Sequence, residues 1–320
     1  MRPLWNDVVT AIVLGLLLPG VLLNGAALYL DTGPVPQVQT EETRPPQAAL
    51  RMYLRNSDGG VQMQNMDDYL IGVVMAEMPA SFETEALKAQ AVAARTYTYK
   101  AFSTGGKHGD GSVCMDPGCC QAYLTEEDYL AKGGSREGIE KVCGAVLATS
   151  GEVLTYDGEL IEATYFSCSG GSTEDASAVW GTEFPYLQAV SSPGEERASY
   201  HTDTITVSPR QFQTALGREL PGPPQTWFGE PSYTAGGGVD TITIGSEAYT
   251  GTQLRSLLNL RSTAFSFSAE ADAITITTKG YGHRVGMSQY GADAMAVAGS
   301  TYGEILAHYY PGTTLTRIQP

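Results

Sequence analysis

A run of 23 uncharged residues near the N-terminus, residues 8–30, limits what this 320-residue chain can fold into, because so long an apolar stretch rarely joins a soluble core. As a helix it would span about 35 Å, enough to cross a bilayer, and it exceeds the apolar region of a typical signal peptide. Arg2 precedes it and no Lys or Arg follows until Arg44, so the positive-inside rule predicts a cytoplasmic tail at residues 1–7 and the remainder outside the membrane. We expect a single-pass membrane anchor; the alternative is a signal peptide cleaved near residues 25–27.

The rest of the chain is predicted to form a linker and a mixed domain. Residues 31–48 hold four prolines among Thr, Gln and Glu, which is typical of a stiff, extended linker. Residues 49–320 are long enough to bury a sizeable core. Helical and strand-like segments occur there without a regular βαβ rhythm, which favours the α+β class. Residues 195–270 are predicted to be a smaller inserted subdomain.

Hydrophobic patterns, caps and turn signals predict the main elements. A strand pair is expected over residues 49–65, with a turn at 57–60. Ser81 is the expected N-cap of the second helix. The predicted helices cover residues 66–77, 82–102, 129–143, 208–220, 252–259, 288–297 and 302–309, and the further strands cover 146–149, 153–156, 160–166, 239–244 and 273–277.

Charge and cysteine content narrow the function classes. The chain has 19 Lys and Arg against 35 Asp and Glu, a net charge of −16 without a basic cluster. Nucleic acid is therefore excluded as a partner on electrostatic grounds, and a neutral polymer such as a glycan fits better. The five cysteines are an odd number, so they do not form a full disulfide set, and unpaired thiols in an exported protein point to a metal site or weakly oxidising surroundings.

Glu77 is the candidate catalytic residue. It closes the strongly apolar helix predicted over residues 66–77, which Pro79 ends because the residue before a proline is pushed out of the helical region. The negative end of the helix macrodipole and apolar neighbours both disfavour the ionised carboxyl group, so its pKa should rise. A carboxyl group that stays protonated near neutral pH suits a general acid. A surface Glu at a helix end would show the same pattern.

A Gly-rich loop carries candidate metal ligands. His108, Cys114 and Cys120 place one imidazole and two thiols within 13 residues, with the spacing His-x5-Cys-x5-Cys. These are ligands that zinc prefers, and three of them leave a fourth position open. Cys119 is an equally placed third ligand, and a disulfide from Cys114 to Cys119 or Cys120 is the alternative.

Two further loops offer substrate-binding candidates. Ser169 lies in a run of small hydroxyl residues followed by Gly-Gly, which suits either a sugar-binding turn or a plain tight turn. His283 follows a Gly-rich stretch and is a candidate for orienting a substrate or acting as a second acid or base. Gln289 and Tyr290 are candidates for hydrogen bonding to sugars and stacking on them.

Several motifs, in order, resemble the family of stage II sporulation protein D and the related amidase enhancers. The resemblance covers about residues 50–315 and is far more specific than a short motif. It is carried by Tyr69-Leu70-x-Gly72-Val73-Val74-x-x-Glu77-Met78-Pro79, Glu85-Ala86-Leu87-Lys88-Ala89-Gln90-Ala91-Val92-Ala93-Ala94-Arg95-Thr96-Tyr97, Cys120-Gln121-x-Tyr123, Ala163-Thr164-Tyr165-Phe166-Ser167 with Ser169-Gly170-Gly171, Leu260-Arg261-Ser262-Thr263, and Gly282-His283-x-Val285-Gly286-Met287-Ser288-Gln289-Tyr290-Gly291-Ala292.

The resemblance implies a membrane-anchored lytic transglycosylase that cuts peptidoglycan glycan strands outside the cytoplasmic membrane and leaves a 1,6-anhydro sugar. In sporulation such proteins act during engulfment with stage II sporulation proteins P and M. The family's catalytic Glu falls on Glu77. Its zinc ligands, where present, fall on His108, Cys114 and Cys120. We expect such a zinc ion to be structural and to organise the Gly-rich loop, although an open fourth position also allows a catalytic role.

Two departures from the family pattern and two alternatives remain. Cys168 stands where relatives usually have Thr or Ser, and Arg284 replaces a common Gly.

The first alternative function is a non-catalytic, glycan-binding activator of a cell-wall amidase, as the other branch of the family implies. The second is a zinc hydrolase that cleaves amide bonds with metal-activated water, although the chain has no His-Glu-x-x-His motif.

Overall fold

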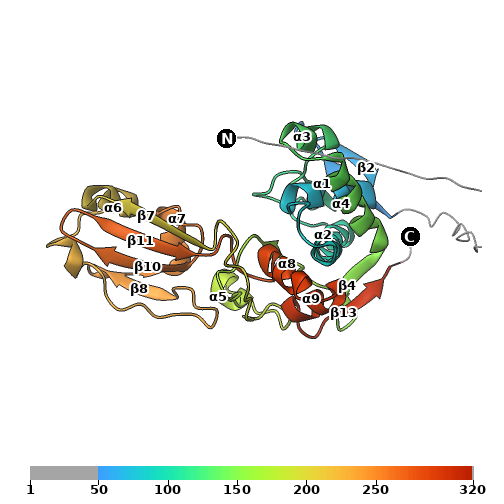
Figure 1. The fold of residues 1–320 in the computed structure, drawn as a ribbon. Coiled ribbons are helices and arrows are strands. Elements are labelled where there is room, and N and C mark those ends of the chain that lie inside the picture. Colours follow the sequence, from blue (N-terminus) through green and yellow to red (C-terminus); the bar gives the residue numbers. More distant parts are fainter. Residues whose placement is uncertain (1–49, 319–320) are drawn as a thin grey trace, which may run out of the picture. The chain divides into compact units, whose positions relative to one another are not determined.

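Helix α2 (Thr84–Thr104) is the centre of the main hydrophobic core in the computed structural model, which describes residues 50–318 (Figure 1). It packs against α1, α4, α8, α9 and β4. The predicted tail and anchor, and the linker at residues 31–48, lie outside the described residues. Between residues 50 and 318, no helix combines the length and the apolar character that a membrane crossing requires.

Helix α1 (Met66–Glu77) has the predicted bounds. Asn65 caps its N-terminus by accepting a hydrogen bond from the backbone N–H of Asp67 at 2.9 Å. Met78, directly before Pro79, has an extended backbone and ends the helix. The apolar side chains of α1 are buried in the main core, so Glu77 is placed at the edge of that core.

A buried ion pair fixes the start of α1. The guanidinium group of Arg95 on α2 is fully buried and lies 3.0 Å from the carboxylate of Asp67 on α1. The same guanidinium donates to the backbone carbonyls of Val146 and Glu152. Through Arg95, these bonds connect α1 to α2, α4 and β4, and so fix the position of the helix that carries Glu77.

Three predicted helices differ from the observed ones. The helix predicted over residues 208–220 ends at Leu216, because Gly217, with a φ of 70°, caps it. The second helix begins at Thr84 and not at residue 82, because Pro79 and Phe82 close a turn through a backbone hydrogen bond of 3.0 Å, so Ser81 is not its N-cap. The helix predicted over residues 129–143 is two helices, α3 (Glu126–Ala131) and α4 (Arg136–Ala148). They are separated at Gly133, whose φ of 92° ends the first helix. The strand predicted over residues 146–149 is wrong, because these residues form the end of α4 and the turn after it.

The remaining elements form several small sheets and a mixed, α+β arrangement, as predicted. The first sheet has the order β2-β1-β3, with β1 and β2 antiparallel. A two-stranded parallel sheet of β12 and β6 and a three-stranded sheet of order β13-β4-β5 also belong to the main core region. The bounds are β1 (Arg51–Arg55), β2 (Val61–Asn65), β3 (Ser112–Cys114), β4 (Glu152–Tyr156), β5 (Glu159–Leu160), β6 (Tyr165–Phe166), α5 (Ala176–Trp180), β12 (Met287–Ser288), α8 (Gln289–Val297), α9 (Tyr302–Tyr309) and β13 (Thr314–Arg317).

Residues 202–279 have a second hydrophobic core, centred on Phe212, Ile244 and Ile274. It joins a sheet of order β10-β11-β7 to a β8-β9 hairpin, and this region overlaps the predicted subdomain at 195–270. Helix α6 begins with a capping box at Ser208. The elements are β7 (Thr202–Val207), α6 (Pro209–Leu216), a 3-10 turn (Pro224–Thr226), β8 (Thr241–Ile244), β9 (Glu247–Thr250), α7 (Gly251–Leu257), β10 (Ala264–Ala269) and β11 (Ile274–Lys279).

Candidate active site

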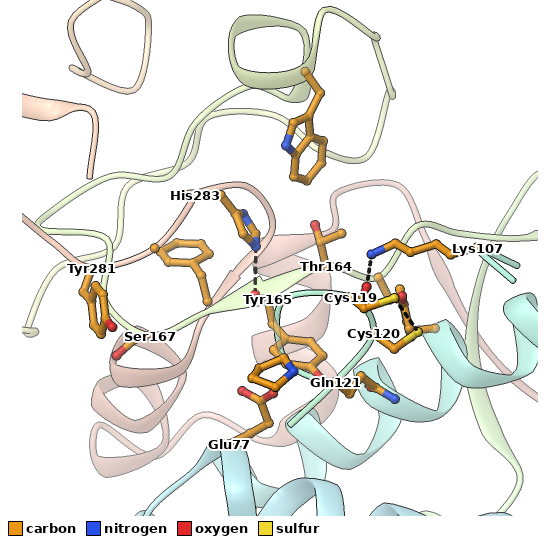
Figure 2. Close-up of a pocket in the computed structure, with 17 residues that line it drawn as sticks. Glu77, Lys107, Cys119, Cys120, Gln121, Thr164, Tyr165, Ser167, Tyr281 and His283 are labelled. Carbon is orange, nitrogen blue, oxygen red and sulfur yellow. Dashed lines mark hydrogen bonds between the residues drawn. The ribbon is translucent and has the colours of Figure 1, made fainter. Parts of the chain in front are cut away.

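A cleft of about 530 Å³ lies at the C-terminal end of α1 (Figure 2). Its walls come from the loop at residues 117–121, from β6 and the residues around it, and from the loop at 281–283. Of the described residues that line it, Glu77 alone carries a carboxyl group. The cleft therefore joins three of the sequence motifs around a single acid.

Glu77 is half-buried and is held by two hydrogen bonds. Its Oε1 accepts from the backbone N–H of Ala122 at 3.0 Å, and its Oε2 accepts from Nε2 of Gln289 at 3.1 Å. Burial raises the pKa of the Glu77 carboxyl group, and the two donors lower it without cancelling the effect of burial. The carboxyl group is thus both oriented and biased toward its protonated form, which is what a general acid requires.

A hydrogen-bonded network beside Glu77 fixes the neighbouring side chains. The hydroxyl group of Tyr165 donates to Oε1 of Gln121 at 2.8 Å, and Nε2 of Gln121 donates to the hydroxyl groups of Thr98 and Tyr69. Burial, with a smaller contribution from the charge of Glu77, raises the pKa of Tyr165 well above its ordinary value. Tyr165 therefore stays a neutral phenol in the wall of the cleft.

His283 lines the cleft, but both of its ring nitrogens are engaged. Nε2–H donates to the backbone carbonyl of Tyr165 at 3.1 Å (Figure 2). Nδ1 accepts from the backbone N–H of Val285 at 3.1 Å. Burial, followed by the nearby charge of Arg255, lowers the pKa of His283 to about 4. The imidazole is thus neutral and structurally held, so the geometry argues against its acting as a second acid or base.

Two exposed aromatic side chains in the cleft were missed by the sequence analysis. Trp180 at the end of α5 is 43% exposed, and Tyr281 is 41% exposed. The ring of Trp180 lies 5.3 Å from that of His283, and the guanidinium group of Arg261 lies 5.3 Å from the ring of Tyr281. Both aromatic residues are directly followed by a glycine, which was the available signal in the sequence.

The other three predicted substrate-binding residues are not among the residues that line the cleft. Ser169 is fully buried and donates to Glu195 at 2.9 Å. Gln289 is buried and holds Glu77, while Tyr290 packs edge-on against Phe82 with ring centroids 4.9 Å apart. Their positions support the walls and the acid of the cleft, and none of the three is among the residues that line it.

The two departures from the family pattern are buried. The thiol of Cys168 donates to Glu195 at 3.1 Å, and burial together with that carboxylate raises the pKa of Cys168 to about 12, so the thiol is inert. Arg284 has a φ of 66° and a buried guanidinium group that lies 2.9 Å from the carboxylate of Glu174. Neither residue is among those that line the cleft.

The predicted metal ligands gather at one point near the cleft. The ligand atoms of His108, Cys114, Cys119 and Cys120 all lie within 4.8 Å of one another. All five cysteines of the chain have free thiols, so the alternative of a disulfide from Cys114 is not formed. Cys119 and Cys120 also line the cleft, close to Lys107, whose ammonium group donates to the backbone carbonyl of Cys119 (Figure 2).

Comparison with known proteins agrees with these motifs. The family model described as "Stage II sporulation protein" matches residues 56–156. The chain is 36% identical to stage II sporulation protein D of Bacillus amyloliquefaciens, over 95% of this chain and 93% of the relative. It is 38% identical to stage II sporulation protein D of Bacillus subtilis (strain 168), over 82% of this chain and 77% of the relative.

A second kind of relative is the amidase enhancer of Bacillus subtilis (strain 168), which is 31% identical over 77% of this chain and 40% of the relative. The extent and level of the first two similarities are sufficient to assign the family. The chain belongs to the stage II sporulation protein D family, as its motifs predicted.

Proposed function

We propose that this protein is a lytic transglycosylase that cleaves the glycan strands of peptidoglycan. The observation that carries the proposal is Glu77: an oriented carboxyl group with a raised pKa that is the single acid among the described residues lining the cleft. The membership in a sporulation family supports a role in remodelling the cell wall during engulfment.

One carboxyl group is sufficient for the proposed reaction. Protonated Glu77 donates its proton to the glycosidic oxygen while an oxocarbenium-like centre develops at C1 of N-acetylmuramic acid. The Glu77 carboxylate then takes the proton of the C6 hydroxyl group of the same sugar, and O6 bonds to C1 to close the 1,6-anhydro ring. Ordinary glycosidases need a second carboxylate to supply or activate the nucleophile, whereas here the nucleophile is intramolecular.

The hydrogen bonds of Glu77 suit both of its roles. The backbone N–H of Ala122 and the amide of Gln289 hold the two carboxyl oxygens, so the acid faces the cleft in one orientation. The same two donors stabilise the carboxylate that forms after proton donation. The proton taken from the C6 hydroxyl group restores the protonated form, and burial, which raises the pKa, keeps Glu77 in that form until the next turnover.

Zinc would be held by His108, Cys114 and Cys120, with the thiolate and imidazole groups that this ion prefers. The close approach of these ligand atoms fits a single ion. The loop that carries them continues into Ala122, the donor to Glu77. We therefore propose that the zinc is structural and that it orders this loop.

Trp180 and Tyr281 are proposed to stack against sugar rings in the cleft. Replacing Trp180 with Ala should raise KM for glycan strands about ten-fold, as expected for the loss of about 1.4 kcal/mol of aromatic contact, with a smaller change in kcat. Steady-state kinetics on glycan strands measure the effect. Tyr233→Ala is the matched control, because Tyr233 is 59% exposed and lies outside the cleft; equal KM values for both variants would contradict stacking at Trp180.

Product analysis tests the proposed reaction directly. The full chain is incubated with peptide-free glycan strands and the products are examined by mass spectrometry. New ends with 1,6-anhydromuramic acid would support the transglycosylase. Hydrated reducing ends would indicate a hydrolase, and new amino groups without glycan shortening would indicate amide cleavage.

The amidase enhancer of Bacillus subtilis gives a second candidate function, since 77% of this chain matches 40% of that protein. In that case the cleft would bind glycan and a partner amidase would perform the cleavage. Intact strands in the product analysis, with stimulation of an added cell-wall amidase, would favour this function. If a Glu77→Gln variant stimulated the amidase as strongly as the native protein, this stimulation would not depend on catalysis by Glu77.

We further propose that residues 8–30 anchor the protein and that its glycan-cleaving domain acts on the extracytoplasmic side, with stage II sporulation proteins P and M as partners. Deleting residues 1–44 should release the protein from the membrane fraction, because it removes the uncharged span. Sedimentation of both forms after cell breakage measures this. Continued sedimentation of the deletion variant with membranes would show that another segment supplies the attachment.

A further inference from the structure

The metal-ligand cluster contains one more thiol than the proposed three-ligand site uses. The Sγ atoms of Cys119 and Cys120 lie 3.7 Å and 3.6 Å from Nε2 of His108 and 3.8 Å from each other. Together with Cys114, these atoms form a compact group in which every pair is within 4.8 Å.

These separations are those of a tetrahedral zinc site. With Zn–S bonds of about 2.3 Å and a Zn–N bond of about 2.0 Å, the edges of a tetrahedron are about 3.8 Å between two sulfurs and about 3.5 Å between sulfur and nitrogen. The separation of 3.8 Å between the two sulfurs is far longer than the bond of about 2.05 Å in a disulfide. The cluster is therefore arranged for coordination by both cysteines.

The backbone explains how adjacent cysteines face one point. The N–H groups of Cys119 and Cys120 both donate to the carbonyl of Asp116, at 3.0 Å and 2.8 Å. The side chain of Asp116 accepts from Gly118 N–H at 2.8 Å and completes the turn. This tight turn lets two cysteines that are adjacent in the chain direct their sulfurs toward the same point.

We propose that Cys119 is a fourth protein ligand and closes the coordination sphere of the zinc ion. This inference rests on the zinc site proposed above. Four protein ligands leave no position for water, which is the mark of a structural site. Three thiolates and one imidazole would give the site a net negative charge, and the ammonium group of Lys107, bonded to the carbonyl of Cys119, places a compensating positive charge beside it.

Closure of the sphere has a consequence for the cleft. A zinc ion with four protein ligands cannot activate water, so the zinc hydrolase alternative would lose its mechanism. The ion would instead hold residues 108–120, directly before Gln121 and Ala122. Gln121 bonds to Tyr165, and Ala122 bonds to Glu77, so the ordered loop would position both neighbours of the reacting sugar.

X-ray absorption spectroscopy of the reduced, zinc-loaded full chain tests the inference without an activity assay. The expected first shell is three sulfurs at about 2.3 Å and one nitrogen at about 2.0 Å. Cys119→Ser should reduce the count to two sulfurs. It should also weaken zinc binding, in competition with a chelator, by more than the 10–100-fold that loss of an outer-shell partner costs.

Cys143→Ser is the matched control, because Cys143 is a half-buried thiol on α4 and is not one of the four clustered ligands; it should change neither measurement. Two sulfurs in the native protein, or an unchanged spectrum in Cys119→Ser, would overturn the fourth ligand and leave the three-ligand zinc and the glycan-cleaving function standing. If the chain does not take up zinc and its mass is 2 Da lower than that of the reduced chain, a disulfide has formed. That result would overturn both zinc proposals but not the proposed glycan cleavage.

Discussion

Replacing Glu77 with Gln is expected to lower the rate of glycan cleavage by about 10²–10⁴-fold, the range that a positioned general acid contributes. The amide of Gln cannot donate a proton to the glycosidic oxygen or take one from the C6 hydroxyl group. Its oxygen can still accept from Ala122 N–H, and the side-chain amide of Gln289 can rotate to present its own oxygen, so the fold should be preserved. The measurement is the initial rate of 1,6-anhydro product formation.

The same substitution should change how stability depends on pH. Burial raises the pKa of Glu77 in the folded chain, so between the ordinary pKa of about 4.3 and the raised one the folded state holds a proton that the unfolded state has lost. The native protein therefore loses stability as the pH rises through this window, and Glu77→Gln does not. The thermal midpoint of the variant should match that of the native protein below pH 4 and exceed it increasingly above that.

Two outcomes would contradict this assignment of Glu77. Equal turnover by the native protein and Glu77→Gln would remove Glu77 as the acid. Parallel stability profiles across the pH range would mean that the carboxyl group ionises at its ordinary pKa and is not poised as an acid. Gln289→Glu serves as a second test, since a second carboxyl group beside Glu77 should raise the pKa of the pair and shift the pH profile of activity upward.

Local signals in the sequence were sufficient for α1 and its acid. The apolar run over residues 66–77 and Pro79 after it were enough to predict this helix, and the structure has the same bounds. The short apolar run at 146–149 was assigned to a strand, because so short a run does not distinguish a strand from the end of a buried helix. Packing against α1 and α2 decides that these residues continue α4.

The partners of the acid could not be predicted from spacing. Gln289 lies 212 residues after Glu77 in the chain, and the motif around it indicates sugar binding as readily as support for an acid. The same holds for Ser169, whose hydroxyl group is used internally by Glu195. Which polar groups face the cleft depends on long-range packing, so the sequence predicts the members of the site better than their roles.

Arg284→Met is expected to lower the free energy of unfolding by about 3–5 kcal/mol, the cost of leaving a buried charge without its partner. The side chain of Arg284 is 3% exposed and that of Glu174 is 1% exposed, and they lie 2.9 Å apart. The guanidinium group also donates to the carbonyls of Ser169, Ser172 and Gly236. Removing it would leave the buried charge of Glu174 without a counter-charge and take a donor from each of the three carbonyls. It would also release the loop that carries Tyr281 and His283 from the turn at 169–174.

Further variants separate the charge from the backbone. Arg284 has a φ of 66°, which costs a non-glycine residue about 1–2 kcal/mol, so Arg284→Gly should be less destabilising than Arg284→Met by about that amount. Adding Glu174→Gln to Arg284→Met should recover part of the loss, because the unpaired charge is then absent. Urea denaturation measures all of these variants. If the free energy of unfolding of Arg284→Met is within 1 kcal/mol of that of the native protein, the ion pair of Arg284 and Glu174 does not hold the loop at 281–283 against the turn at 169–174.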